Sequence, residues 1–182
     1  MFQNAFSMRL AGLQYIRPRL FQDERGYFLE SYRQPSYLEE GLPLFVQDNL
    51  SFSKRNTLRG LHYQTDPGQA KLVTCLLGKI LDVVVDLRPD SSTFGEWEAV
   101  ELDGDSHAQF FIPVGFAHGY CSLTDTTLVQ YKVSALYDPK AERSIRWNDP
   151  DLKIDWPISD PILSPRDAMS PFFRDVFGEI RQ

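Results

Sequence analysis

Three histidines, His62, His107 and His118, are the side chains of this sequence best suited to moving protons or holding a metal. Imidazole changes its charge near neutral pH and is also a common metal ligand. His107 follows a Gly-Asp-Ser turn, so we expect it to lie in a solvated surface loop. His62 and His118 lie in the denser segments LRGLHYQ and IPVGFAHG. A catalytic metal site generally takes three protein ligands, so two histidines predict a site without metal.

The second of these segments carries the pattern Pro113-x-Gly115-x-x-His118, which resembles the second motif of the cupin superfamily. A metal-binding cupin also needs a His-x-His pair, and this chain has His62-Tyr63-Gln64 in that place. The pattern therefore indicates a cupin-like jelly roll and argues against a metal-dependent oxygenase.

A base alone performs little chemistry, and three further residues are candidates for the same site as His62: Lys71, Tyr131 and Asp167. Taken singly, each has an ordinary structural explanation. A lone strand tyrosine usually packs with a polar tip, and an aspartate after Ser-Pro-Arg is usually a turn or cap residue. The motifs that flank these residues make them candidates for a functional role.

Short strands separated by turn residues must position these groups. Lys71–Leu77 and Ile80–Leu87 flank Gly78-Lys79, which predicts a hairpin, with Asp82 opposite the apolar face of the second strand. The other predicted strands are Tyr27–Tyr32, Trp97–Leu102, Gln109–Ile112, Gly119–Leu123 and Leu128–Val133. Many short strands with frequent Gly and Pro predict an all-β fold, a jelly-roll sandwich or barrel.

Helices are expected to be few and peripheral, at Ser36–Glu40 and near Asp167–Phe173. The segment from Asp149 onward contains five prolines, so it predicts neither a central strand nor a long helix. We expect it to wrap the outside as an ordered strap. With no repeat or linker in 182 residues, the sequence predicts one domain, residues 1–182.

Composition excludes several classes of function. A net charge of −6 argues against general nucleic-acid binding, which needs a basic surface. No apolar run is long enough to span a membrane, and the N-terminal segment has no apolar core of a signal peptide. Two cysteines, Cys75 and Cys121, are too few for a disulfide scaffold and are expected to be buried thiols. A cytoplasmic protein is the default expectation.

Taken together, the motifs resemble the dTDP-4-dehydrorhamnose 3,5-epimerase family. The resemblance rests on these runs, which occur in family order along nearly the whole chain: QDN (47–49), LRGLHYQ (58–64), QAKLV (69–73), DVVVD (82–86), FGEW (94–97), IPVGFAHG (112–119), YK (131–132), WNDP (147–150) and LSPRD (163–167). It implies a homodimeric jelly roll without cofactor or metal. The implied substrate is dTDP-4-dehydro-6-deoxy-D-glucose, inverted at C3 and C5 beside the C4 ketone.

The resemblance also implies roles for five catalytic residues. His62 is the base, Lys71 holds the enolate oxygen, and Tyr131 delivers a proton from the opposite face. Asp167 is the expected partner of His62, and Asp82 is a second acidic candidate for that role.

Substrate binding is implied for ten more positions. Arg25 and Arg59 match diphosphate contacts, Tyr137 matches the aromatic residue that stacks on thymine, and Arg25 and Glu30 are expected to reach the neighbouring subunit's site. The full set is Arg25, Glu30, Gln47, Asp48, Asn49, Arg59, His118, Tyr137, Glu142 and Arg166.

Three positions depart from the family pattern: Leu50 after Asp-Asn, Leu136 where a second aromatic is common, and Arg166 in place of lysine. Two alternatives stay open at this point. One is an epimerase that inverts only C3 or only C5, and the other is a cupin that binds a sugar nucleotide without catalysis.

Overall fold

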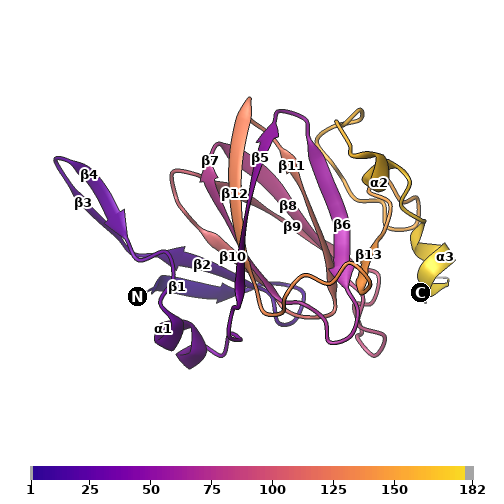
Figure 1. Ribbon diagram of the computed structural model, residues 1–182, viewed down its shortest axis with the longest axis horizontal. Coiled ribbons are helices and arrows are strands. Elements are labelled where there is room, and N and C mark those ends of the chain that lie inside the picture. The colour runs from indigo at the N-terminus through magenta and orange to yellow at the C-terminus, as the bar shows by residue number, and fades with distance from the viewer. Residues whose placement is uncertain (1, 179–182) are drawn as a thin grey trace.

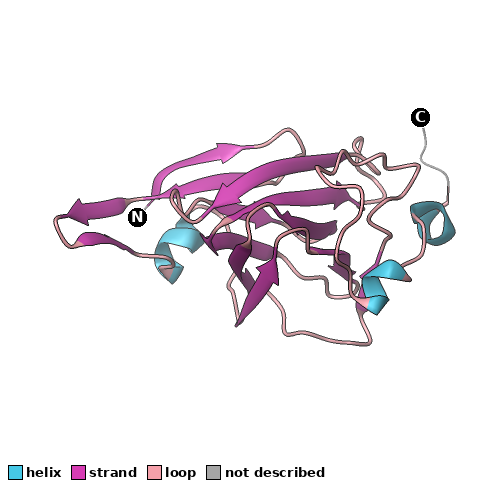
Figure 2. Ribbon diagram, turned by 90° about the horizontal axis from the view of Figure 1, so that it is seen from above, coloured by secondary structure: helices cyan, strands magenta, loops and turns pink. Residues whose placement is uncertain are grey.

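The computed structural model describes residues 2–178 as two antiparallel sheets that face each other (Figures 1 and 2). Sheet one consists, in spatial order, of β1 (Phe2–Ser7), β2 (Gln14–Pro18), β10 (Gln109–Ile112), β7 (Lys71–Leu77), β12 (Thr126–Val133) and β5 (Gln47–Lys54). Sheet two consists of β13 (Glu142–Ser144), β6 (Leu58–Gln64), β11 (Phe116–Ser122), β8 (Lys79–Asp86) and β9 (Trp97–Asp103). The predicted all-β, cupin-like fold is confirmed.

The main core fills the space between the two sheets. Val73 and Phe110 point inward from sheet one and meet Ile80, Val84 and other residues of sheet two. These side chains are fully buried, and each contributes roughly 1.5–3 kcal/mol by leaving water. The predicted alternation in β8 is present, because Val83 and Val85 pack on the opposite, outer side of the same strand.

That outer side of sheet two is covered by the C-terminal strap, residues 149–178, as the prolines predicted. Leu152, Trp156 and Phe173 of the strap pack against Val83 and Val85. The strap carries two helices of little more than one turn, α2 (Pro165–Ala168) and α3 (Phe173–Phe177), where one helical piece was expected. In Figure 1 the strap is the yellow segment beside β6 and β13.

The hairpin predicted around Gly78 is wrong. β7 pairs with β10 and β12 in sheet one, whereas β8 pairs with β11 and β9 in sheet two. Gly78, with φ of +78°, turns the chain from one sheet to the other, and a side chain there would overlap the Thr126 carbonyl oxygen. A tight turn between two apolar strands is compatible with a hairpin or with a change of sheet, and pairing partners decide which forms.

Other expectations need smaller corrections. The strand predicted at Tyr27–Tyr32 ends early, as β4 (Gly26–Leu29), and pairs with β3 (Leu20–Asp23) in a hairpin that projects from the sheets (Figures 1 and 2). Helix α1 spans Gln34–Glu39. Cys75 and Cys121 are free, buried thiols, as expected. The strands β1, β2, β3, β5, β6 and β13 had no sequence prediction.

His107 is not a solvated loop residue. It is 5 % exposed, and its Nε2 forms a hydrogen bond with the hydroxyl of Tyr27, which lies in β4 of the projecting hairpin. The rings of His107 and Tyr27 also lie 4.8 Å apart. The turn was identified correctly, but the His107 side chain is buried against Tyr27 of the hairpin.

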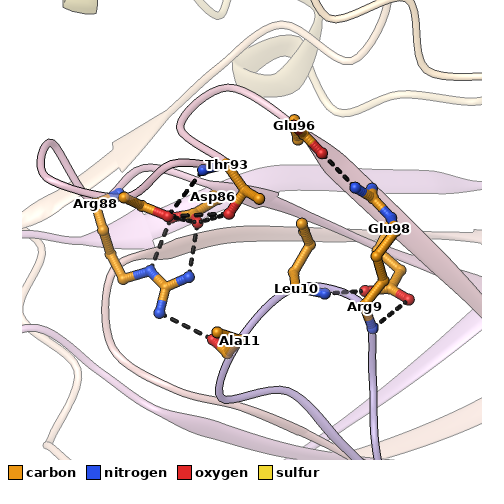
Figure 3. A network of polar contacts seen from close by, with 9 residues as sticks. Arg9, Leu10, Ala11, Asp86, Arg88, Thr93, Glu96 and Glu98 are labelled. Carbon is orange, nitrogen blue, oxygen red and sulfur yellow. Dashed lines mark hydrogen bonds and ion pairs between the residues drawn. The ribbon is translucent and has the colours of Figure 1, made fainter.

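A network of ion pairs fastens the N-terminal loop to sheet two (Figure 3). Asp86, fully buried, accepts from the Arg88 guanidinium at 2.7 and 2.9 Å and from the hydroxyls of Ser91 and Thr93. Arg88 also donates to the Ala11 carbonyl at 2.9 Å. Burial alone would raise the pKa of Asp86, but these donors lower it to about 2.

Replacing Asp86 by asparagine should lower the free energy of unfolding at pH 7 by about 3 kcal/mol, because the Arg88 guanidinium, whose side chain is 31 % exposed, loses its buried charge partner. Since the folded-state pKa of Asp86 is depressed to about 2, its stabilisation is complete above the ordinary value of about 3.9 and is lost as pH falls through about 2. Urea unfolding from pH 3 to pH 7 should therefore show that the difference in the free energy of unfolding between wild type and Asp86→Asn becomes smaller below pH 4. The same change at exposed Asp90 is the control; an equal effect there would contradict the prediction.

Candidate functional site

A β-bulge in β6 determines which side chains enter the space between the sheets. His62 pairs with His118, and Arg59 pairs with Tyr120. Between these two pairs β6 has one more residue than β11. The extra residue lies at Gly60, which has φ of +117°. A Cβ at Gly60 would lie 2.6 Å from the Gly119 Cα, so the close approach of the two strands requires glycine. Because of the bulge, Arg59 and His62, three residues apart, face the same cavity.

This cavity has a volume of about 480 Å³ and takes its walls from both sheets. The sheet-one wall consists of Gln47, Asn49 and Ser51 of β5, Lys71 of β7 and Tyr131 of β12. The sheet-two wall consists of Arg59, His62, Tyr63 and Gln64 of β6 and His118, Gly119 and Tyr120 of β11. Gln69, Tyr137, Glu142, Ser164, Arg166 and Asp167 complete the lining.

His62 and Asp167 form the first hydrogen-bonded imidazole–carboxylate pair of the cavity. The imidazole Nε2 lies 2.6 Å from Asp167 Oδ1, although the two residues are 105 positions apart. The Asp167 side chain is 5 % exposed and that of His62 is 29 % exposed. Burial opposes ionisation of Asp167, but hydrogen bonds from His62, the Ser164 side chain and the Gly60 backbone lower its pKa. A buried carboxylate therefore orients an imidazole that remains open to the cavity.

His118 and Asp82 form a second such pair, on neighbouring strands β11 and β8. The His118 Nε2 lies 2.9 Å from both oxygens of Asp82, which is fully buried. Burial raises the pKa of Asp82, against the charges of His118 and Lys71. The sequence left two aspartates as partners of His62, and the structure pairs His62 with Asp167 and His118 with Asp82.

Lys71 places a cation in the wall at the start of β7. It is 7 % exposed, and burial lowers its pKa to about 8, against the charges of Glu142 and Asp82. A lysine with this pKa is protonated at neutral pH and holds a poorly hydrated positive charge. Such a charge stabilises a negative oxygen more strongly than a solvated one does.

Tyr131 faces the cavity from β12, opposite the sheet that carries His62. Burial raises its pKa, and the nearby Tyr120 and Glu142 add to the effect. The phenol is therefore protonated at neutral pH and available as a donor. The cavity thus has an imidazole on one wall and a phenol on the other.

Polar residues at the mouth are tied together. Glu142 forms an ion pair with Arg166 and accepts a hydrogen bond from the Tyr137 hydroxyl at 3.0 Å. Tyr137 is 52 % exposed, so its ring is accessible for stacking. Arg59 is held by Ser53 Oγ and the Phe52 carbonyl, each at 3.0 Å, which directs its guanidinium along β5.

Three residues of the predicted binding set lie outside the cavity. Arg25, at the tip of the β3–β4 hairpin, has an 86 % exposed side chain paired with Asp23. Glu30 follows the same hairpin and lies 3.9 Å from Arg33. Asp48 points to the other side of β5 from Gln47 and Asn49 and forms an ion pair with Lys132. Within one chain these three do not join the others.

Seven lining residues were absent from the predicted set: Ser51, Tyr63, Gln64, Gln69, Gly119, Tyr120 and Ser164. Several lie within the motif runs already noted, so proximity to His62 and Lys71 was the available signal. Gln69 is oriented by the Ala135 carbonyl at 2.9 Å. Tyr120 is placed by hydroxyl contacts with Ser51 and Ser53 at 2.8 and 3.2 Å.

Among residues 2–178, no three His, Cys, Asp or Glu side chains converge in a way that could hold a metal ion. The imidazole nitrogens of His62 and His118 that have partners face carboxylates instead. Over the same residues, no helix has both the length and the apolar character needed to cross a bilayer.

Comparison with known proteins gives consistent similarities. A sequence model of the family described as dTDP-4-dehydrorhamnose 3,5-epimerase matches residues 7–175. A protein of that name from Pseudomonas aeruginosa is 49 % identical over 164 residues, which cover 88 % of this chain and 91 % of the relative. A Streptomyces niveus protein named dTDP-4-dehydrorhamnose 3-epimerase is 44 % identical over 161 residues, covering 87 % and 78 %.

Among solved structures, a Legionella pneumophila dTDP-6-deoxy-D-glucose-3,5-epimerase in complex with dTDP-4-keto-L-rhamnose is similar over almost the whole fold. Its TM-score is 0.92 at 43 % identity, with coverage of 95 % of this chain and 94 % of that one.

The charge of Glu142 should help to keep Lys71 protonated. Replacing Glu142 by glutamine removes the largest opposing charge, so the pKa of Lys71 should fall below its present value of about 8. An NMR titration of the lysine side-chain carbons measures this directly. Glu101→Gln, which removes the same charge from a surface pair with Lys79, is the matched control. A pKa of Lys71 that stays or rises in Glu142→Gln would refute this account of the cation.

Proposed function

The chain belongs to the dTDP-4-dehydrorhamnose 3,5-epimerase family, and we propose that it performs the family's reaction with His62 as base and Tyr131 as acid. It is an isomerase that converts dTDP-4-dehydro-6-deoxy-D-glucose to dTDP-4-dehydro-L-rhamnose, in dTDP-L-rhamnose biosynthesis. The observation that carries the assignment of roles is the imidazole and the phenol on opposite walls of one cavity.

The chemistry requires three kinds of group. A hydrogen on a carbon beside a ketone becomes acidic only because the resulting charge moves to the carbonyl oxygen as an enolate. The site therefore needs a base, a donor or cation at that oxygen, and an acid on the opposite face of the carbon. A base or acid contributes typically about 10²–10⁴-fold, and a preorganised oxyanion donor about 10²–10³-fold.

The geometry supports His62 as the base. Its imidazole is exposed to the cavity, and the buried carboxylate of Asp167 stabilises the imidazolium that forms when it takes a proton. Lys71, protonated at neutral pH, is the proposed partner of the C4 oxygen. His118, held by Asp82, is the proposed donor to the sugar from the sheet-two wall.

Tyr131 completes the inversion. A proton removed on one face and returned on the other inverts a carbon, so base and acid must face the sugar from opposite sides. Sheet two supplies His62, and sheet one supplies Tyr131, whose raised pKa keeps it protonated. The same pair can serve C3 and C5 in turn if the ketone, once reprotonated at the first carbon, shifts in the cavity before its second α-proton is removed.

The nucleotide half of the substrate is assigned to the mouth of the cavity. Tyr137 offers an exposed ring for the thymine, and Arg59 offers a guanidinium for the diphosphate. Arg166 and Glu142 lie beside Tyr137. Gln47 and Asn49 are held together at 2.8 Å and present amide groups to the sugar.

Inversion at a single carbon is the second candidate. The Streptomyces niveus relative is named as a 3-epimerase and is nearly as similar to the chain as the 3,5-epimerases are. A site with one base and one acid is compatible with either outcome, because the position of the sugar decides which carbons meet them.

We propose that the working form is a homodimer. The β3–β4 hairpin projects from the body of the chain, with Phe21, Tyr27 and Phe28 each about half exposed or more. Isolated hairpins with exposed aromatic residues are marginally stable in water, which favours their burial against a second copy. Arg25, at the hairpin tip, would then reach the partner's cavity, and Glu30 would follow it.

We also propose that the chain works as a single domain in the cytoplasm. Residues of both sheets share one core cluster, so neither sheet could fold without the other. Cys75 and Cys121 are unpaired thiols, as expected for a reducing compartment.

Deuterium exchange tests the reaction. With dTDP-4-dehydro-6-deoxy-D-glucose in deuterated water, NMR should show deuterium entering at both C3 and C5. His62→Ala should lower exchange at both carbons by about 10²–10⁴-fold, because the base is gone. Tyr131→Phe should still allow exchange but impair inversion, most plainly at C5.

Binding of dTDP by each variant, measured by calorimetry, is the control and should be unchanged. Deuterium at one carbon only would establish the single-centre epimerase. If the wild-type protein incorporates deuterium at neither carbon, the proposed function is refuted. If a variant exchanges and inverts at the wild-type rate, the substituted residue has no part in the mechanism.

The dimer proposal predicts complementation between two inactive chains. Mixed and reassembled, His62→Ala and Arg25→Ala chains should recover up to about a quarter of wild-type activity, because half of the dimers then contain one intact site of two. Each variant alone, taken through the same reassembly, is the control. Activity that fails to exceed that of the variants alone would mean that Arg25 does not act across the dimer.

A further inference from the structure

The carboxylate that orients His62 is carried by a helix of only one turn. Helix α2 spans Pro165–Ala168, and Asp167 is buried within it. So short a helix has almost no stability of its own, since nucleation costs more than one turn returns. The position of Asp167 must therefore be set by contacts at the two ends of the turn.

The N-terminal end is fixed by Ser164. Its hydroxyl accepts a hydrogen bond from the Asp167 backbone N–H at 3.1 Å, and its carbonyl accepts from Ala168 N–H at 3.0 Å. This is an ordinary N-cap, and it orients the turn without connecting it to the strand that carries His62.

The C-terminal end is fixed by Ser170, three residues after Asp167 and therefore on the same side of the turn. Ser170 is 2 % exposed. Its hydroxyl lies 2.9 Å from the Ser144 hydroxyl and 3.3 Å from the Arg166 carbonyl. The Ser170 carbonyl accepts from Arg146 Nε at 2.9 Å, so the residue is held from both sides.

Ser144 is the residue of β13 directly opposite His62 on β6. Residues opposite each other in an antiparallel pair point to the same face of the sheet. Two contacts thus run in parallel from neighbouring positions of sheet two to the same turn: His62 to Asp167, and Ser144 to Ser170. The second contact fixes the separation that the first requires.

We infer that the Ser144–Ser170 hydrogen bond is a positioning contact for the His62–Asp167 pair. The inference rests on the proposed function of His62 as base. Without the bond, α2 keeps its N-cap, the Arg166–Glu142 ion pair and the contact of Asp167 with the Gly60 backbone, but its C-terminal end loses the hydroxyl contact with the strand residue opposite His62. Asp167 then spends part of its time away from His62, and the imidazolium formed during proton transfer is stabilised less.

The experiment compares Ser170→Ala, Ser144→Ala and the double variant with wild type. Ser122→Ala is the matched control, because Ser122 and Thr127 form a buried hydroxyl pair at 2.6 Å on β11 and β12, and neither residue lines the cavity. Each protein is measured for its Tm, its dTDP binding, its kcat and KM, and the pH dependence of kcat/KM. The Ser170→Ala change is also made in an Asp167→Asn background.

Ser170→Ala and Ser144→Ala should each lower kcat about five- to tenfold, in line with the loss of one hydrogen bond, with KM and dTDP binding unchanged. The double variant should be no worse than either single one. The acidic limb of the kcat/KM profile should move to lower pH, because the imidazolium has lost part of its partner. In the Asp167→Asn background, Ser170→Ala should have no further effect on kcat.

A readout without turnover comes from the imidazole N–H of His62 in proton–nitrogen NMR. A short, charge-assisted hydrogen bond gives a strongly low-field proton, which should move upfield in Ser170→Ala and stay in place in Ser122→Ala. With three histidines in the chain, the signal is assignable from His107 and His118 variants.

Several outcomes would overturn the inference: a lower Tm with unchanged kcat and pH profile, a loss of the same size in Ser122→Ala, or an additive loss in the Asp167→Asn background. An unmoved His62 N–H signal in Ser170→Ala would do the same. These failures are distinct from failure of the proposed function, which appears as an absence of epimerisation by the wild-type protein in the same assay.

Discussion

The close approach of β6 and β11 at Gly60 and Gly119 is the constraint on which the site depends. A regular strand would point Arg59 and His62 to opposite faces, because side chains alternate with period two. The bulge at Gly60 returns both to the cavity while Leu58 and Leu61 remain in the outer core beneath the strap. The same bulge leaves the Gly60 backbone N–H free to contact Asp167. One residue without a side chain thus allows β6 to have a packed outer face and an inner face whose side chains line the cavity.

Charge burial is the second organising feature. Lys71, Asp82 and Asp167 are each less than a tenth exposed, and an isolated charge at such a depth would be neutralised or expelled. Each has a partner that offsets part of this cost: Asp167 has His62, Asp82 has His118, and Lys71 has the charges of Asp82 and Glu142. The result is a cation that keeps its proton at neutral pH and an imidazole, the proposed base, whose protonated form would face a carboxylate. These are the two requirements of chemistry through an enolate.

The sequence was most informative where local pattern and local structure coincide. Strands such as Lys71–Leu77 and Gln109–Ile112 were found at their observed ends, since apolar runs bounded by Gly or Pro have few other solutions. β5 and β6 were not predicted, because their outward and inward faces carry polar site residues that hide the alternation. The hairpin at Gly78 and the exposure of His107 failed because pairing partners and burial are decided by distant segments. The cavity residues were found largely through family resemblance, whereas Ser51 and Tyr120, which lie outside the quoted motif runs, needed coordinates.

The strap explains why the sequence could identify Asp167 as a candidate site residue but could not predict its position in the fold. It lies 105 residues after His62, so the chain must close a long loop to bring the two together. Closing a loop costs entropy that grows only slowly with length, and the five prolines between 149 and 171 reduce the freedom that the strap must lose. Buried anchors such as Trp156 and Phe173 then hold it on sheet two. A carboxylate on a rigid, well-anchored strap needs only small local contacts to reach its final position, so single hydrogen bonds at the ends of α2 can matter to the chemistry.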